Sequence, residues 1–176
     1  MPGPVFREGE TVELRTVEKE DVDFLQEVVN PPDVRPHIFQ SDPLNRGQEE
    51  AWVESLDEID GFHFLICDAG TPVGICGLND PVESWGLAEA GYMIHPDHWD
   101  NGYATDAVRE LCGYAFEERR YNKVTARAYE TNPASRRVLE KVGFTEEGRF
   151  RAEAFVDGEF VDVYRYGLLA EEWTGP

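Results

Sequence analysis

A mixed α/β fold, with one sheet covered by helices, is predicted by the order of two sequence patterns. Stretches in which apolar and polar residues alternate, as in strands, are interleaved with stretches of apolar residues at helical spacing. Read along the chain, the order is β α α β β β α β α β β, without repeats, low-complexity segments or linkers. A chain of 176 residues is long enough for one domain with its own core, so we expect one domain over residues 1–176.

The first half of the chain contains two predicted helices and four predicted strands. Asn30-Pro31-Pro32 ends the first helix, and Ala69-Gly70-Thr71 is a hairpin signal between two strands. The predicted elements are a strand at 11–17, helices at 21–29 and 45–58, and strands at 62–68, 72–78 and 87–94.

The second half alternates helices and strands before a final hairpin. Asn132 is the expected N-cap of the later helix, Pro133 its first residue and Gly143 the residue after its end. Asp157-Gly158 is a typical two-residue hairpin turn. The predicted elements are helices at 102–118 and 132–144, a strand at 124–128, and two strands within 150–169.

The composition is strongly acidic, with 36 Asp and Glu against 16 Lys and Arg and a net charge of −20. The acid is spread along a chain rich in aromatic residues, so it coats a folded domain and does not form a disordered tail. We interpret it as adaptation to a salty cytoplasm, the alternative being a surface for a basic partner. A nucleic-acid partner is not expected, because there is no basic patch.

Three cysteines without CxxC spacing predict neither a disulfide framework nor a metal site. They are expected to be small buried residues in a reducing compartment. No signal-peptide pattern opens the chain, and no apolar run reaches the length of a membrane helix. We therefore expect a cytoplasmic protein with no membrane partner.

The junction HPDHWDNGYATDAV, residues 95–108, joins a strand to a helix with small residues at Gly102 and Ala104. A helix N-terminus offers unpaired N–H groups and the positive end of the helix dipole. A diphosphate can lie against such a backbone when the side chains are small. The alternative is an ordinary turn, and neither GxGxxG nor GxxxxGK is present.

Two further features point to a cleft beside this junction. Asn132 and Ser135 begin another helix that follows another strand, so the two strand–helix units can form two walls of one cleft. Glu89 lies in the middle of a predicted strand, where glutamate is disfavoured. Burial would raise the pKa of Glu89 and make it a usable base, whereas pairing with an arginine across the sheet would make it structural.

These motifs, in this order and spacing, resemble the GNAT superfamily of N-acetyltransferases, and within it the RimJ/RimL-like branch. Trp99-Asp100-Asn101-Gly102-Tyr103-Ala104 is similar to the pyrophosphate motif Gln/Arg-x-x-Gly-x-Gly/Ala, with Trp99 at its first position. The runs AEAGYMIHP, NPASRRVLEKVGFTEEG and AEAFVDGEFVDVYRYGLL are similar to that branch as well. The resemblance covers about residues 9–170, and it implies a mostly antiparallel central sheet that is split at the cofactor strands and flanked by helices.

The resemblance implies that acetyl-CoA is the co-substrate. Its pantetheine arm would bond to the backbone near Met93 and Ile94, where a bulge opens the strand. Asn132 would hold pantetheine or order the cleft. Apart from the resemblance, positive charge for a phosphate is available from Arg109, Arg136, Arg137 and Lys141. The pyrophosphate would cap the helix that begins at Asp100, Asn101, Gly102, Tyr103, Ala104 and Thr105.

The resemblance also implies that an amine attacks the thioester directly. Many members use a tyrosine as the acid, but Leu139 stands at the matching position here. Ser135 is the substitute acid, and Glu89 is the candidate base. Tyr92 and Glu153 are weaker candidates.

The expected acceptor is a protein N-terminal α-amine, as in the ribosomal-protein acetyltransferases of this branch. The alternatives are a small-molecule amine, such as a polyamine, an amino acid or an antibiotic, and a sensor domain that binds acyl-CoA without turnover. The acceptor pocket is expected at residues 30–60 and the hairpin at 145–160. A homodimer is expected by resemblance only.

Overall fold

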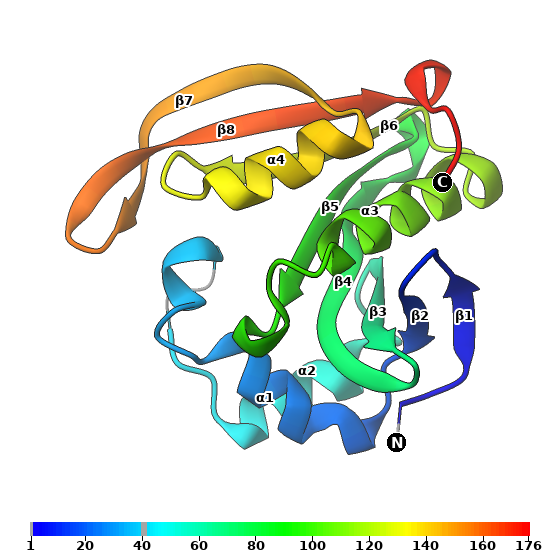
Figure 1. The fold of residues 1–176 in the computed structure, drawn as a ribbon, viewed down its shortest axis with the longest axis vertical. Helices are drawn as coiled ribbons and strands as arrows, with labels where there is room; N and C mark the ends of the chain where they lie inside the picture. The colour runs from blue at the N-terminus through cyan, green and yellow to red at the C-terminus, as the bar shows by residue number, and fades with distance from the viewer. Residues whose placement is uncertain (1, 40–41) are drawn as a thin grey trace.

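The computed structural model describes residues 2–39 and 42–176 and contains one eight-stranded sheet. The strand order is β1-β2-β3-β4-β5-β6-β8-β7, antiparallel throughout except between β5 and β6 (Figure 1). The strands are β1 Val5–Glu8, β2 Glu13–Thr16, β3 Gly61–Asp68, β4 Thr71–Val82, β5 Leu87–Ile94, β6 Lys123–Tyr129, β7 Thr145–Val156 and β8 Glu159–Leu169. The helices are α1 Val22–Val29, α2 Arg46–Ser55, α3 Tyr103–Gly113 and α4 Pro133–Val142.

The predicted mixed, mostly antiparallel fold is confirmed, and most predicted elements are present. The hairpin turn is also confirmed, with positive φ at Asp157 (50°) and Gly158 (90°). Several boundaries differ by a few residues; β7, for example, begins at Thr145, whereas both hairpin strands were predicted within 150–169. Two further differences concern whole segments. The four-residue strand β1 was not predicted, because a strand this short has too few residues to show an alternation. The helix predicted at 102–118 ends at Gly113 and continues as a π-helical turn over Tyr114–Glu118.

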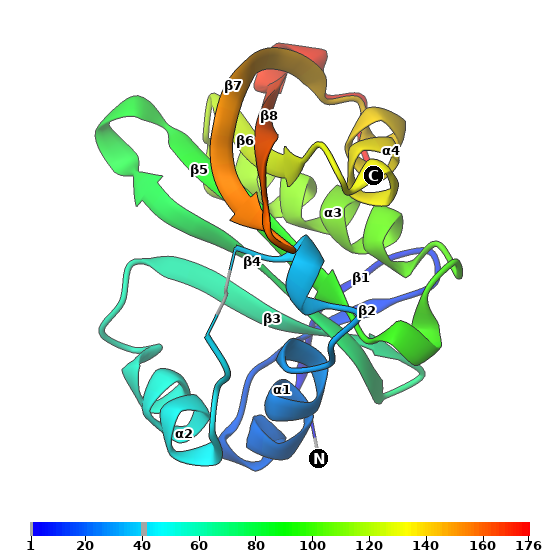
Figure 2. The same ribbon diagram turned by 90° about the vertical axis from the view of Figure 1, so that its left-hand side faces the viewer.

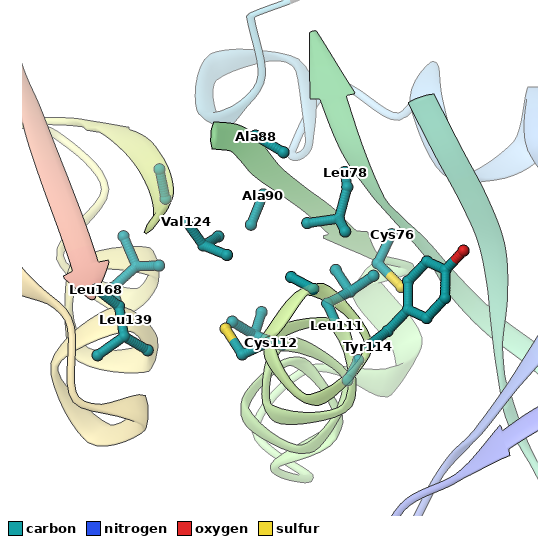
Figure 3. Packing of buried hydrophobic residues seen from close by; sticks show 14 of the residues in the cluster. Cys76, Leu78, Ala88, Ala90, Leu111, Cys112, Tyr114, Val124, Leu139 and Leu168 are labelled. Atoms are coloured by element: carbon teal, nitrogen blue, oxygen red, sulfur yellow. The ribbon is translucent and has the colours of Figure 1, made fainter. Parts of the chain in front are cut away.

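The two faces of the sheet carry different helices (Figures 1 and 2). In β3, Phe64 and Ile66 belong to the main core, while Leu65 and Cys67 pack with α1 and α2. This alternation follows from the period of two in a strand. On the main-core side, Leu111 and Cys112 of α3 lie between the strands and Leu139 of α4 (Figure 3).

Asp106 of α3 ties the helix to the turn between β1 and β2. Its carboxylate accepts hydrogen bonds from the backbone N–H groups of Glu10, Thr11 and Val12, and from the Thr11 hydroxyl, at 2.7–3.1 Å. Burial opposes the charged form, but the hydrogen bonds outweigh burial and lower the pKa of Asp106 below its usual value. The first turns of α3 are therefore held in place by the turn between β1 and β2.

The sheet splits between its two central strands. β5 and β6 pair only from Leu87–Glu89 to Lys123–Thr125. Beyond Glu89, β5 continues along β4 to Ile94, and β6 continues along β8 to Tyr129. The predicted split is confirmed, and the backbone edge of β5 after Glu89 is left unpaired by β6.

The bulge expected at Met93 and Ile94 is wrong. These residues pair regularly with Ile75 and Gly74, and the irregularity in the β4–β5 register lies between Asn79 and Val82. Asp80 has a φ of 47°, and Pro81 follows it. Proline has no N–H to donate to the ladder, so the pairing is interrupted there.

Candidate active site

A cavity of about 1080 Å³ lies where β5 and β6 separate. Its walls come from both halves of the sheet, from the β5–α3 junction, from the start of α4 and from residues 34–39. The structure brings all twelve predicted site residues to this cavity. They are Glu89, Met93, Ile94, Asp100, Asn101, Gly102, Tyr103, Ala104, Thr105, Asn132, Ser135 and Arg137.

The β5–α3 junction presents open backbone to the cavity. Gly102 precedes α3 with a φ of 82°, a conformation that favours glycine, and a Cβ built there would meet no atom within 4 Å. The loop before it is fixed by its own hydrogen bonds. The Trp99 indole donates to the Ile94 carbonyl at 2.8 Å, and the Asn101 amide donates to the carbonyls of His98 and Trp99 at 3.1 Å. The first N–H groups of α3 thus face a space that a phosphate group fits.

The start of α4 forms the opposite wall. Asn132 is the N-cap, as predicted, and its side-chain oxygen accepts from the Ser135 N–H at 3.0 Å. Gly143 ends the helix with a φ of 109°, also as predicted. Arg137 and Lys141 line the same cavity and are suitably charged for the phosphate groups of a ligand.

Ser135 is paired with a tyrosine that the sequence analysis ranked lower. The Tyr92 hydroxyl lies 2.8 Å from Ser135 Oγ and 3.1 Å from the Ser135 carbonyl oxygen. Burial raises the pKa of Tyr92, so its hydroxyl stays protonated at neutral and moderately alkaline pH. The single proton of Tyr92 goes either to the Ser135 carbonyl oxygen, which can only accept, or to Ser135 Oγ. When it goes to Ser135 Oγ, the Ser135 proton is available to a group in the cavity.

Leu139 does not face the cavity. Its side chain is fully buried against Leu168 in the main core (Figure 3). The Tyr92–Ser135 pair thus places two hydroxyl groups in the cavity wall of a chain that lacks a tyrosine at residue 139.

Of the two alternatives for Glu89, the structure shows the ion pair with an arginine across the sheet and not full burial. About a quarter (26%) of its side chain is exposed, and its Oε1 accepts a hydrogen bond from Arg127 Nε at 2.8 Å. The pairing follows from the split, since Arg127 lies two residues beyond the last residue of β6 that pairs with β5. Glu89 is thus both a wall of the cavity and half of a cross-sheet ion pair.

The hairpin of β7 and β8 contributes no residue to the cavity among those that the structure describes. Glu153, a weaker candidate, lies on this hairpin and is exposed away from the cavity. The far end of the cavity is formed by residues 34–39, Trp52, Ile59 and Asp60. Residues of the segment 30–60, which was expected to shape the acceptor pocket, thus line the cavity, whereas no described residue of the hairpin at 145–160 does.

The sequence analysis missed His63 and Asn79, which line the cavity from adjacent strands. His63 Nε2 lies 3.1 Å from Asn79 Oδ1, and burial lowers the pKa of His63 and keeps the imidazole neutral. The two side chains pass over Gly77 and Gly91, where a Cβ would lie within 3.0 Å of them. No sequence motif contains these residues, since only the register of three strands brings them together.

The split sheet and the helix N-terminus that is open to a phosphate are features that the resemblance to the GNAT superfamily implied for an acetyltransferase. A family model described as an acetyltransferase (GNAT) domain matches residues 11–145, and the chain belongs to this family. It is an N-acetyltransferase with acetyl-CoA as co-substrate and an amine as acceptor.

Several similar proteins match more than nine-tenths of the chain. A putative ribosomal N-acetyltransferase of Bacillus subtilis, YdaF, is 30% identical, over 95% of this chain and 96% of its own. A spermidine N-acetyltransferase from Vibrio cholerae, in complex with CoA and spermine, has a TM-score of 0.85 at 24% identity, covering 92% and 97% of the two chains. RimL, a ribosomal L7/L12 α-N-protein acetyltransferase in complex with coenzyme A, has a TM-score of 0.83 at 18% identity, covering 94% and 98%.

The residues present fit the co-substrate. Acetyl-CoA supplies the activated acetyl group, and the open backbone at Gly102 and the cations Arg137 and Lys141 suit its phosphates. No helix in the described part of the chain is long and apolar enough to cross a membrane.

Proposed function

We propose that this protein acetylates the α-amine at the N-terminus of a protein, of the ribosomal-protein kind. The observation that carries the proposal is the ion pair between Glu89 and Arg127 at the cavity wall. A nearby guanidinium disfavours an ammonium and favours a neutral amine. Deprotonation at pH 7 costs about 4–5 kcal/mol for a lysine amine and about 1–1.5 kcal/mol for an α-amine. Because Glu89 is already paired with Arg127, it suits the deprotonation of an α-amine, which costs less, better than the deprotonation of a lysine amine.

The similarity to a putative ribosomal N-acetyltransferase at 30% identity supports the same proposal. In the proposed site, Glu89 accepts the amine proton through water, and the Tyr92–Ser135 pair supplies a proton to the leaving sulfur. The main support for the sensor alternative was Leu139 in place of a tyrosine. The Tyr92–Ser135 pair weakens that support, because it provides hydroxyl groups in the cavity wall.

The second candidate acceptor is a polyamine. Asp60 and Asp80 line the cavity together with Glu89, and carboxylates attract a cation of several charges. A similar protein from Vibrio cholerae is named as a spermidine N(1)-acetyltransferase, at 24% identity over 91% of this chain.

A panel of acceptors tests the proposal. The protein is given acetyl-CoA with a peptide that has a free N-terminus and no lysine, the same peptide with a blocked N-terminus and one lysine, and spermidine. We expect kcat/KM to be highest for the free N-terminus by about tenfold or more, since the deprotonation cost differs by about 3 kcal/mol. A higher kcat/KM for spermidine would replace the proposal with the polyamine candidate.

We propose further that the protein works in a salty cytoplasm. The net charge of −20 repels the CoA anion at low ionic strength, and salt screens that repulsion. The affinity for acetyl-CoA, measured by titration calorimetry, is expected to rise or stay constant as KCl is raised toward molar concentration. A steady weakening over this range would rule the idea out.

Light scattering in the same buffers tests the expected homodimer.

A further inference from the structure

Arg127 lies where β6 has left β5, and it bridges two walls of the cavity. Its Nε donates to Glu89 of β5 at 2.8 Å. The centre of its guanidinium lies 4.7 Å from the centroid of the Phe39 ring, which belongs to the segment that covers the cavity. Phe39 in turn packs on Tyr129 at 4.4 Å between ring centroids. The positive charge of Arg127 is therefore held in place by the Glu89 carboxylate and the Phe39 ring.

The sheet places this charge where it is unfavourable for stability. Arg127 stands directly opposite Arg165 in the antiparallel β6–β8 ladder. Like charges at directly opposed positions destabilise a sheet. Arg165 does not line the cavity, and Arg127 does. A pair of like charges that is unfavourable for the sheet and lies at a cavity wall indicates that the charge of Arg127 serves a function.

The other charged groups at this end of the cavity are acidic. Asp60 and Asp80 line it with Glu89, while His63 is neutral because burial lowers its pKa. Without Arg127, the charged side chains that line this end of the cavity would be three carboxylates. Such a wall would suit an acceptor with several positive charges.

We propose that Arg127 is a specificity-determining residue whose positive charge excludes polycationic amines and admits an acceptor with a single amine. The inference rests on the proposed function, and it deepens that function by naming the group that separates the two candidate acceptors. Exclusion by a like charge is a common way to gain specificity, because it weakens the wrong partner more than the right one. Arg127 acts on the acceptor through its charge, and its pairing with Glu89 and Phe39 keeps that charge at the wall.

The test compares kcat/KM for spermidine with kcat/KM for the free N-terminal peptide in Arg127→Gln, Arg127→Lys and Arg165→Gln. Arg127→Gln is expected to raise the spermidine-to-peptide ratio about tenfold, the effect of one unit charge in a partly solvated site. Arg127→Lys keeps the charge and is expected to keep the wild-type ratio. Arg165→Gln removes the same charge from the facing strand outside the cavity and is expected to leave the ratio unchanged.

Each outcome decides one of the two claims. An unchanged ratio in folded Arg127→Gln overturns the inference, and so does an equal rise in Arg165→Gln, which would mean a general charge effect. A wild-type protein that prefers spermidine overturns the proposed function, whatever the variants do. If Arg127→Gln does not fold, Arg127→Met keeps an unbranched stem against Phe39 and gives the same measurement.

Discussion

Replacing Gly102 with leucine is expected to abolish the stabilisation of the protein by acetyl-CoA. At about 100 times its Kd, a ligand adds roughly 2.7 kcal/mol, a rise in Tm of about 5–11 °C for a chain of this size. A leucine side chain at Gly102 would meet no protein atom within 4 Å of its Cβ, so it would extend into the space where the backbone meets the phosphates. Thermal unfolding with and without acetyl-CoA, in molar KCl, measures the effect.

Gly158→Leu is the matched control for this experiment. Gly158 also has a positive φ (90°) and no atom within 4 Å of a built Cβ, but it lies at the turn of the β7–β8 hairpin, outside the cavity. Each substitution should cost about 1–2 kcal/mol in backbone strain. Both variants should therefore melt lower, and only Gly102→Leu should lose the response to acetyl-CoA. Equal responses of the two variants to acetyl-CoA would mean that its phosphates do not bind at the β5–α3 junction.

Tyr92→Phe is expected to lower kcat by about a hundredfold or more, the range of general acid catalysis, with a much smaller effect on the KM for acetyl-CoA. The variant removes the hydroxyl that lies 2.8 Å from Ser135 Oγ. Ser135→Ala should have an effect of similar size. The double variant should be little worse than either single variant, because groups that act as one unit are not additive. Steady-state kinetics with a saturating acceptor measure all three.

The pH profile gives an independent test of the same pair. Burial raises the pKa of Tyr92 above the usual value of about 10, so its proton is retained as the pH rises through that value. With an α-amine acceptor, kcat/KM should rise through about pH 8, as the amine loses its proton, and then stay level to about pH 10. A fall in kcat between pH 8 and pH 10 that Tyr92→Phe removes would mean that Tyr92 ionises early and does not serve as the acid.

Tyr166→Phe is the control for removing a buried tyrosine hydroxyl. Tyr166 is fully buried, its hydroxyl accepts a hydrogen bond from Arg136 at 3.0 Å, and it does not line the cavity. The variant also loses the hydrogen bond that the hydroxyl donates to Glu140 Oε1 at 3.4 Å, so it should lose about 1–3 kcal/mol of stability. We expect kcat to stay within about threefold, because neither partner of the hydroxyl lines the cavity. A loss of kcat equal to that of Tyr92→Phe would assign both effects to packing.

The sequence by itself determined the class of fold and the two helix starts that form the cavity. Local chemistry explains why these features could be predicted. Asn132, Pro133 and Gly143 delimit α4 by capping, and Gly102 marks the β5–α3 junction through a backbone conformation that favours glycine. Such signals depend on residues within a few positions of one another, so they can be read from the chain.

The tertiary structure decided which groups face one another. Glu89 meets Arg127 because β5 and β6 separate after three residue pairs, and Tyr92 reaches Ser135 across that separation. The bulge lies at Asp80 and not at Met93, because Pro81 of β4 breaks the ladder. His63 and Asn79 enter the cavity through the register of adjacent strands. Contacts between residues far apart in the chain depend on how strands align, and that alignment follows from the packing of the whole sheet, which no local motif encodes.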